Sequence, residues 1–193
     1  MQPLLAIERI APSVPDLTGV AALAFTSRNG VEAFAVLSAG RDLPVFTVGD
    51  ATAAAASAAG FGSVRSAAGA LEDLARLLAE GSPGPVLAPG ALEPAGDLAA
   101  LLAGRVEVRA LPVYRAVETG ADAPAAFDAV LVHSPRAGRA LAALGPFAGE
   151  SVVAISEAAA APLRSLPGLE IRVAARPDEA ALLEALGKPA PRV

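Results

Sequence analysis

The residues best suited to chemistry in this chain are small polar residues and a glycine that directly follow short apolar segments. They are Ser27, Asn29, Gly49, Thr52, Ser134 and Ser156. Hydroxyls, side-chain amides and the free N–H groups at a helix start all donate hydrogen bonds, so together they suit an anion such as a carboxylate. Each of the polar residues taken alone also fits the ordinary N-cap of a helix, which is the structural alternative.

Several other chemistries lack the residues that they need. The chain has no cysteine and a single histidine, His133. A thiolate or histidine metal site and a Ser-His-Asp triad are therefore not expected. No Gly-x-Gly-x-x-Gly or Walker loop follows a strand, so a dinucleotide or nucleoside triphosphate has no support. We expect neither a metal nor a cofactor.

Charge and composition limit the partners. The net charge is −5, the arginines are scattered, aromatic residues make up 4% and tryptophan is absent. Nucleic acid is not an expected partner, because binding it requires clustered positive charge or stacking platforms. No uncharged apolar run reaches the roughly 18 residues of a membrane span, and we expect no secretory signal. We expect a cytoplasmic monomer that has no contact with a membrane.

The elements that must position the polar residues alternate along the chain. The expected strands are 4–10, 22–26, 45–48, 63–66, 85–88, 106–115, 129–133, 152–155 and 171–174. The expected helices are 30–37, 51–58, 70–79, 95–102, 135–144, 157–166 and 178–186. Continuous apolar strands that alternate with amphipathic helices predict a doubly wound α/β fold with parallel sheets. The polar residues then lie at the carboxyl ends of strands, where such folds bind ligands.

Two segments interrupt the alternation. Segment 4–10 has no helix after it, and segment 106–115 is too long for an ordinary strand and contains Pro112, beyond which we expect it to leave its sheet. We interpret both as linker strands that pair with each other between two lobes. The predicted division is a linker strand at 1–11, a complete α/β domain at 12–111, a linker strand at 112–116 and a second α/β domain at 117–193.

The chain also resembles itself at an offset of 107 residues, which places Ser27 on Ser134 and Gly49 on Ser156. Apolar runs, strand ends and helix starts coincide under this one shift. The pattern predicts two pseudo-equivalent α/β halves. The alternative is two similar βα units that arise from a shared alanine-rich composition. The only tyrosine, Tyr114, lies between the two copies.

Four segments in order carry a resemblance to a known family. They read Phe-Thr-Ser-Arg-Asn-Gly-Val-Glu-Ala-Phe at 25–34, Phe-Thr-Val-Gly-Asp-Ala-Thr-Ala at 46–53, Leu-Pro-Val-Tyr-Arg at 111–115 and Val-Leu-Val-His-Ser-Pro at 130–135. In this order and spacing the chain resembles uroporphyrinogen-III synthase over roughly residues 3–186. Each motif is weak alone, but the ordered set is specific.

The resemblance implies a fold and an activity. The fold is two doubly wound, flavodoxin-like parallel-sheet domains joined by a two-stranded β-ladder. The activity is that of a cyclising hydro-lyase of haem biosynthesis, which needs no cofactor. It closes the linear hydroxymethylbilane with inversion of ring D and loss of water. Tyr114 matches the family's tyrosine that is proposed to assist departure of the bilane hydroxyl; the alternative is that its ring only packs an inter-lobe hinge. Acetate and propionate groups of the substrate would bind Thr26, Ser27, Asn29, Gly49, Thr52 and Ser134.

The chain departs from the family pattern at two places. Ala159 stands where a hydroxyl is expected, and Ser156 is a candidate to replace it. The family's first strand and helix, which belong to the second domain, have no counterpart, so we expect a short or N-terminally truncated form. These departures keep open a non-catalytic, two-lobed anion-binding or tetrapyrrole-binding module descended from the family. A flavodoxin-like nucleotide binder is a further alternative.

Overall fold

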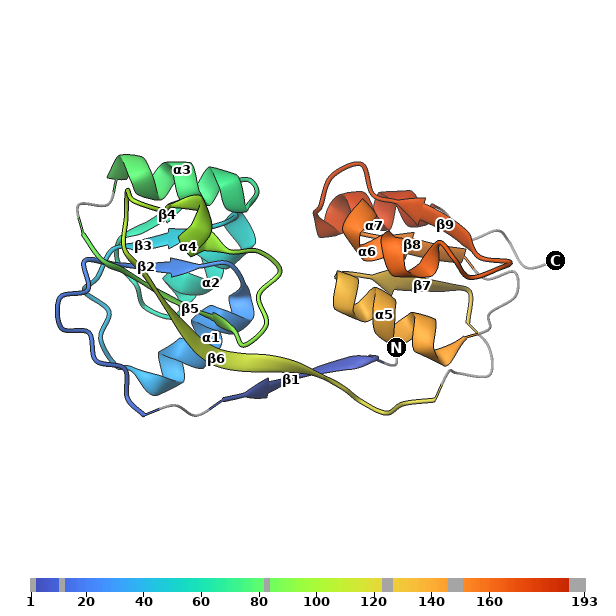
Figure 1. Cartoon of the computed structure of the whole chain (residues 1–193), viewed down its shortest axis with the longest axis horizontal. Helices are drawn as coiled ribbons and strands as arrows, with labels where there is room; N and C mark the ends of the chain where they lie inside the picture. Colours follow the sequence, from blue (N-terminus) through green and yellow to red (C-terminus); the bar gives the residue numbers. More distant parts are fainter. Residues whose placement is uncertain (1–2, 11–12, 82–83, 123–126, 146–150, 188–193) are drawn as a thin grey trace. The chain divides into compact units, whose positions relative to one another are not determined.

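The structure is a computed structural model that describes residues 3–10, 13–81, 84–122, 127–145 and 151–187 (Figure 1). By its internal contacts the chain divides into two units. The larger unit is Ile7–Ala116, and the smaller unit consists of Met1–Ala6 and Val117–Val193. Each is described below by itself.

The larger unit contains a parallel sheet flanked by helices. Its strands are β2 (Ala22–Phe25), β3 (Val45–Thr47), β4 (Val64–Ser66), β5 (Val86–Ala91) and all but the last two residues of β6 (Val108–Glu118). Its helices are α1 (Arg28–Leu37), α2 (Asp50–Ala58), α3 (Leu71–Gly81) and α4 (Leu98–Leu101). All four pairings among these strands are parallel. The sequence-based prediction of a parallel α/β fold is confirmed.

The alternation of side chains along β2 shows that both faces of this sheet are covered. Leu23 and Phe25 pack with α1 and α2 in one core, whereas Ala22 and Ala24 pack with α3 and α4 in another. Successive residues of a strand point to opposite faces, so a strand buried on both sides must be apolar throughout. All four residues of β2 are buried. The sheet is therefore doubly wound, as predicted.

The strand order shows where this sheet can bind a ligand. The order is β6-β5-β2-β3-β4 with β1 (Leu5–Arg9) outside β6, so the chain runs from β2 to one edge and then returns to the other side of β2. If β2 to β6 are renumbered 1 to 5 and the sheet is read from β4 to β6, the order is 3-2-1-4-5. This order differs from the 2-1-3-4-5 order of flavodoxin. The sequence pattern shows which segments are strands but not the order in which they pair. The direction of winding changes between β2 and β5, and ligands bind at the carboxyl ends of such strands.

Strands β1 and β6 form a two-stranded ribbon (Figure 1). Ile10 N–H donates to Val113 O at 2.9 Å, and Thr119 N–H donates to Leu4 O at 3.0 Å, so the two strands run antiparallel. An exposed ion pair joins Glu8 and Arg115 across the ribbon at 2.7 Å. Pairing between β5 and β6 extends to Tyr114, which is two residues beyond the expected departure at Pro112.

The smaller unit has the same kind of construction. Its described strands are β7 (Ala129–Val132), β8 (Ser151–Ala154) and β9 (Glu170–Val173), paired in that order and parallel. Its helices are α5 (Pro135–Leu144), α6 (Glu157–Ala160), the 3-10 turn η1 (Ala161–Leu163) and α7 (Glu179–Leu186). Residues of α5, α6 and η1 pack on one face, and α7 packs on the other.

The internal repeat predicted from the sequence corresponds to equivalent elements. A shift of 107 residues places β2 on β7 and α1 on α5 with the same bounds, and it places β3 and β4 on β8 and β9. Helices α1 and α2 share one face with each other, as α5 and α6 do. Agreement in order, pairing and covered face goes beyond what a shared composition would produce, so the halves are structurally equivalent.

Two predicted helices are shorter than expected. The segment 95–102 is helical only at Leu98–Leu101, because Asp97 accepts the Ala100 N–H at 3.0 Å and so starts the helix late. The segment 157–166 ends its α-helix at Ala160 and continues as a 3-10 turn that contains Pro162. None of the helices in the described ranges is both long and apolar enough to span a membrane.

Candidate active site

Two predicted site residues meet in the larger unit. The Ser27 Oγ and Tyr114 OH atoms lie 2.8 Å apart, although the residues are 87 positions apart in sequence. Tyr114 is only 8% exposed, and Ser27 is half-buried. Ser27 lies two residues after the end of β2, and Tyr114 lies on β6 beside the end of β5, so the pair sits at the carboxyl ends next to the change in winding direction. This is where the fold predicts a ligand.

Helix α1 fixes the position of Ser27. Ser27 is its N-cap, and its Oγ accepts the Gly30 N–H at 3.1 Å. Gly30 also lies against the end of β5: a Cβ atom built on it would be 2.7 Å from the carbonyl oxygen of Pro89. Real Cβ atoms do not approach an oxygen so closely. Gly30 therefore lets the first turn of α1 lie directly on β5.

A β-bulge fixes the position of Tyr114. Gly90 pairs with Pro112 and the next residue, Ala91, pairs with Tyr114, so Val113 is an extra residue in β6. Bulges redirect side chains and are frequent next to active sites. Here Val113 and Tyr114 are consecutive and both buried, and both pack against Ala33 of α1. Without the extra residue, strict alternation would send them to opposite faces.

The first turn of α2 presents open donors at the end of the next strand. Gly49 is the N-cap and supplies no side-chain hydrogen bond, so the first amides of the helix have no cap. A Cβ atom at Gly49 would meet nothing within 4 Å, which leaves room for a ligand at these amides. Thr52 is 6% exposed, and its hydroxyl makes no hydrogen bond to any described residue.

The remaining predicted residues of the larger unit flank Ser27. Thr26 is exposed and Asn29 is half-buried in the first turn of α1. Arg28 lies between Ser27 and Asn29, is exposed, and makes no ion pair with a described residue. No negative side chain occupies this turn of the helix. The surroundings of Ser27 thus offer donors and a cation.

The predicted residues of the smaller unit are helix caps. Ser134 Oγ accepts the Ala137 N–H at 3.1 Å, and Ser156 Oγ accepts the Ala159 N–H at 3.3 Å. Ser156 thus caps the helix start that its counterpart Gly49 leaves open. Ala159 is fully buried, where Thr52 carries a hydroxyl. In the same unit, His133 Nε2 lies 3.0 Å from Glu179 Oε2 and links the end of β7 to α7.

Sequence reasoning missed Gly30 and Val113. The sequence did contain a signal for Gly30, because glycine early in a helix is unfavourable and its presence suggests close packing. Nothing in the sequence marks Val113 as a bulge, because the extra residue is defined only by pairing with β5.

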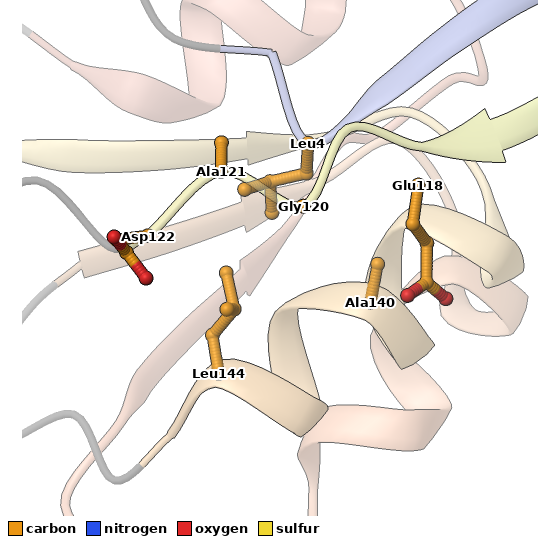
Figure 2. A pocket seen from close by; sticks show the side chains of 7 residues that line it. All are labelled: Leu4, Glu118, Gly120, Ala121, Asp122, Ala140 and Leu144. Carbon is orange, nitrogen blue, oxygen red and sulfur yellow. The ribbon is translucent and has the colours of Figure 1, made fainter.

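Neither of two small hollows is lined by Ser27 or Tyr114. One, of about 120 Å³, is lined in the smaller unit by Leu4, Ala140 and Leu144, with Glu118 and Asp122 on opposite sides (Figure 2). The other, of about 170 Å³, lies beside Ser66 and Arg76 of the larger unit. Both are smaller than the roughly 300 Å³ that even a drug-sized ligand needs.

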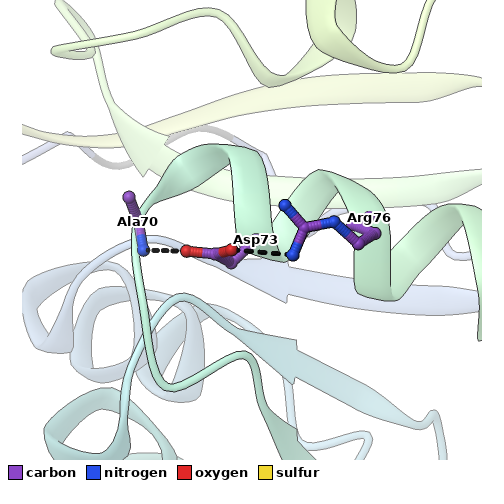
Figure 3. A network of polar contacts seen from close by, with 3 residues as sticks. All are labelled: Ala70, Asp73 and Arg76. Atoms are coloured by element: carbon purple, nitrogen blue, oxygen red, sulfur yellow. Dashed lines mark hydrogen bonds and ion pairs between the residues drawn. The ribbon is translucent and has the colours of Figure 1, made fainter.

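Asp73 and Arg76 at the second hollow already have partners. Asp73 accepts the Ala70 N–H at 2.8 Å and pairs with Arg76 at 2.9 Å (Figure 3). The bond from Ala70, and then Arg76, hold the pKa of Asp73 below its ordinary value. This network stabilises the start of α3. Within the described ranges no group of three or more His, Cys, Asp or Glu residues could hold a metal ion.

Fold and site together define a two-unit parallel α/β protein with a part-buried hydroxyl pair and open helix amides at the carboxyl ends of one sheet. The sequence matches the family model of uroporphyrinogen-III synthase HemD over residues 1–184. The chain belongs to the uroporphyrinogen-III synthase family. The family acts on hydroxymethylbilane, and the chain is accordingly a cyclising lyase of haem biosynthesis.

Solved structures agree with this fold. The uroporphyrinogen-III synthetase of Helicobacter pylori 26695 is 21% identical, with 94% of this chain and 88% of that chain covered and a TM-score of 0.73. A mutant uroporphyrinogen III synthase of the extremely thermophilic bacterium Thermus thermophilus is 19% identical, with 97% of this chain and 79% of that chain covered and a TM-score of 0.56. A comparison with curated proteins gave no match.

Proposed function

We propose that the chain cyclises hydroxymethylbilane at the Ser27–Tyr114 pair, with Tyr114 as the catalytic residue. The observation that carries the proposal is the 2.8 Å contact of the two hydroxyls at the carboxyl ends of the strands where the winding direction changes. A buried phenol at this place can donate a proton to a departing hydroxyl group.

The reaction needs positioning more than reactive groups. The C–O bond of the hydroxymethyl group breaks, its electron pair leaves with the oxygen, and the phenol proton of Tyr114 completes a water molecule. The electron-rich pyrrole stabilises the cation that remains. Ring D then attacks through its substituted carbon to form a spiro intermediate. The bond from this carbon to the bridge that carries ring C breaks, and the unsubstituted carbon of ring D bonds to that bridge instead, which inverts the ring. The proton that this carbon loses returns to Tyr114. Orientation of this kind supplies on the order of 7–11 kcal/mol at best.

The open helix start at Gly49 is the proposed site for carboxylate groups of the substrate. Thr52 offers a hydroxyl there, and Arg28 and Asn29 offer donors beside Ser27. Thr26, Ser134 and Ser156 complete the proposed binding set. Most of the net charge of −5 does not oppose this binding, because helix amides act within about one turn whereas distant charges are screened over about 8–10 Å. Asp50 is the acidic residue in the first turn of α2, so the neutral donors of Thr52 and the amides have to outweigh its charge.

The direct test is the product formed from freshly made hydroxymethylbilane. An active synthase yields the type III isomer, whereas spontaneous closure yields type I. Type III product at a rate proportional to enzyme supports the proposal. Type I product alone refutes it and favours the non-catalytic binding module, which would still bind the bilane.

The proposal extends to organisation and location. The domains are 12–111 and 117–193, linked by the strands within 1–11 and 112–116; hydrogen bonding between β1 and β6 supports a linking role. The protein is proposed to be a cytoplasmic monomer with no nucleic-acid or membrane partner. Light scattering in solution tests the monomeric state, because the mass of a dimer would contradict it.

Gly49→Ser tests the open helix start. A serine cap accepts a hydrogen bond from the first turn of α2, as Ser156 does in α6, and so covers amides that would bind the substrate. We expect a stability gain of a few tenths of a kcal/mol and a KM raised about 3- to 10-fold, with kcat little changed. Thermal unfolding and steady-state kinetics measure the two effects.

Gly62→Ser is the matched control. A Cβ atom at Gly62 also meets nothing within 4 Å, but the residue is in the loop before β4 and caps no helix. Its KM should equal that of the wild type. An unchanged KM in Gly49→Ser would show that the substrate does not reach these amides.

A further inference from the structure

The Ser27 hydroxyl connects a helix start to the phenol. Its Oγ accepts the Gly30 N–H at 3.1 Å and lies 2.8 Å from the Tyr114 hydroxyl. We propose that Ser27 is a positioning residue that acts on the reaction through Tyr114, in place of the carboxylate contact expected for it. The inference rests on the proposed cyclisation.

The charge change at Tyr114 explains why such a residue matters. When the phenol proton moves to the departing oxygen, the Tyr114 oxygen becomes negative while positive charge spreads over the pyrrole. The Ser27 hydroxyl can rotate and donate to that oxygen from 2.8 Å. A donor held ready for a developing charge lowers the barrier, because no group has to reorganise at the moment of reaction.

Helix α1 strengthens this donor. Ser27 caps a helix of 10 residues whose first turn contains no acidic residue, so the positive end of the helix dipole acts on it uncompensated. The bond from Gly30 N–H to Ser27 Oγ polarises the serine hydroxyl and makes its hydrogen a better donor. The effect of the helix start thus passes through Ser27 to the phenol.

The surroundings of Tyr114 keep the pair together. Its ring packs with Val113 and Ala33, and its carbonyl oxygen accepts the Leu92 N–H at 2.8 Å. With the phenol held in this way, loss of the Ser27 hydroxyl is not compensated by movement of the ring to another partner.

A double-mutant cycle tests the inference. Ser27→Ala should lower kcat about 10- to 100-fold with KM within about 3-fold of the wild type, and Ser27→Thr should restore most of the loss. In the Tyr114→Phe background the same substitution should change kcat by less than about 3-fold, because the residue through which Ser27 acts is gone.

A cap of the same kind in the smaller unit serves as the control. Asp178 Oδ1 accepts the Ala181 N–H at 2.8 Å at the start of α7. Asp178→Ala should lower the melting temperature as Ser27→Ala does, with kcat unchanged. Ser27→Gly is the second test variant, because glycine is tolerated at an N-cap and keeps the helix start folded.

The absorption of the single tyrosine gives a readout without substrate. The chain has one tyrosine and no tryptophan, so its near-ultraviolet tyrosine band reports Tyr114. Ser27→Ala and Ser27→Gly should both shift this band, and Asp178→Ala should not. An unshifted band would show that the contact is absent.

The kinetic outcomes separate this inference from the proposed function. One contrary result is that Ser27→Ala lowers kcat equally in the wild type and in Tyr114→Phe, and another is that it raises KM and leaves kcat unchanged. Either result would show that Ser27 contacts the substrate itself, and would refute the positioning role in an active synthase. Type I product alone from the wild type would refute the cyclisation, and the positioning role with it.

Discussion

Tyr114→Phe should lower turnover of hydroxymethylbilane about 10- to 1000-fold while the protein stays folded. The substitution removes the phenol hydroxyl and keeps the ring, so the packing with Val113 and Ala33 is preserved. Only the contact with Ser27 and the donor to the departing hydroxyl are lost. The loss should fall on kcat, measured as the rate of type III product under saturating substrate, with KM little changed.

Thr52→Ala is the matched comparison for Tyr114→Phe. It also removes one buried hydroxyl from the larger unit, but this hydroxyl bonds to no described residue. We expect kcat within about 3-fold of the wild type and a KM raised about 2- to 30-fold, as expected for one of several donors to a carboxylate. Unchanged turnover in Tyr114→Phe would remove the phenol from the mechanism.

The elements were predictable because their signals are local. Helix α5 begins and ends where the sequence predicts, since Ser134 caps it, Pro135 starts it and Gly145 follows it. Buried parallel strands such as β2 are short continuous apolar runs, which can be found from the sequence. The same signals identified Ser27 as a residue at a strand end.

The contact that defines the candidate site was not predictable in this way. The resemblance gave Tyr114 a catalytic role and Ser27 a substrate-binding role, but their 2.8 Å approach depends on the order of β6, β5 and β2 and on one extra residue in β6. Neither is written in local composition. The predicted length of α4 was too long. Alanine-rich segments are compatible with a helix in any context, so local composition does not show where such a helix begins.

The two halves have diverged at the positions that matter for binding. Gly49 leaves the start of α2 open where Ser156 caps α6, and Thr52 carries a hydroxyl where Ala159 is buried. The only tyrosine contacts the serine of the first half. The uncapped helix start at Gly49 and the buried Thr52 hydroxyl without a described partner therefore both lie in the larger unit, and substitutions there should affect catalysis most.

Gly30→Ala should lower kcat about 100-fold and destabilise the protein by about 1–3 kcal/mol. The added Cβ would lie 2.7 Å from the Pro89 carbonyl oxygen, a backbone atom that cannot rotate away. The first turn of α1 must therefore move off β5, and it carries Ser27 with it. A displacement of even about 1 Å separates Ser27 from Tyr114 and misplaces the phenol's partner.

Gly90→Ala is the control for Gly30→Ala, because Gly90 lies beside Pro89 and a Cβ atom there meets nothing within 4 Å. It should fold and turn over like the wild type. Chemical denaturation measures the stability of both variants, and the tyrosine absorption band shows whether Ser27 still contacts Tyr114. A Gly30→Ala protein with wild-type kcat and an unshifted band would show that α1 does not need its close approach to β5 to hold the pair together.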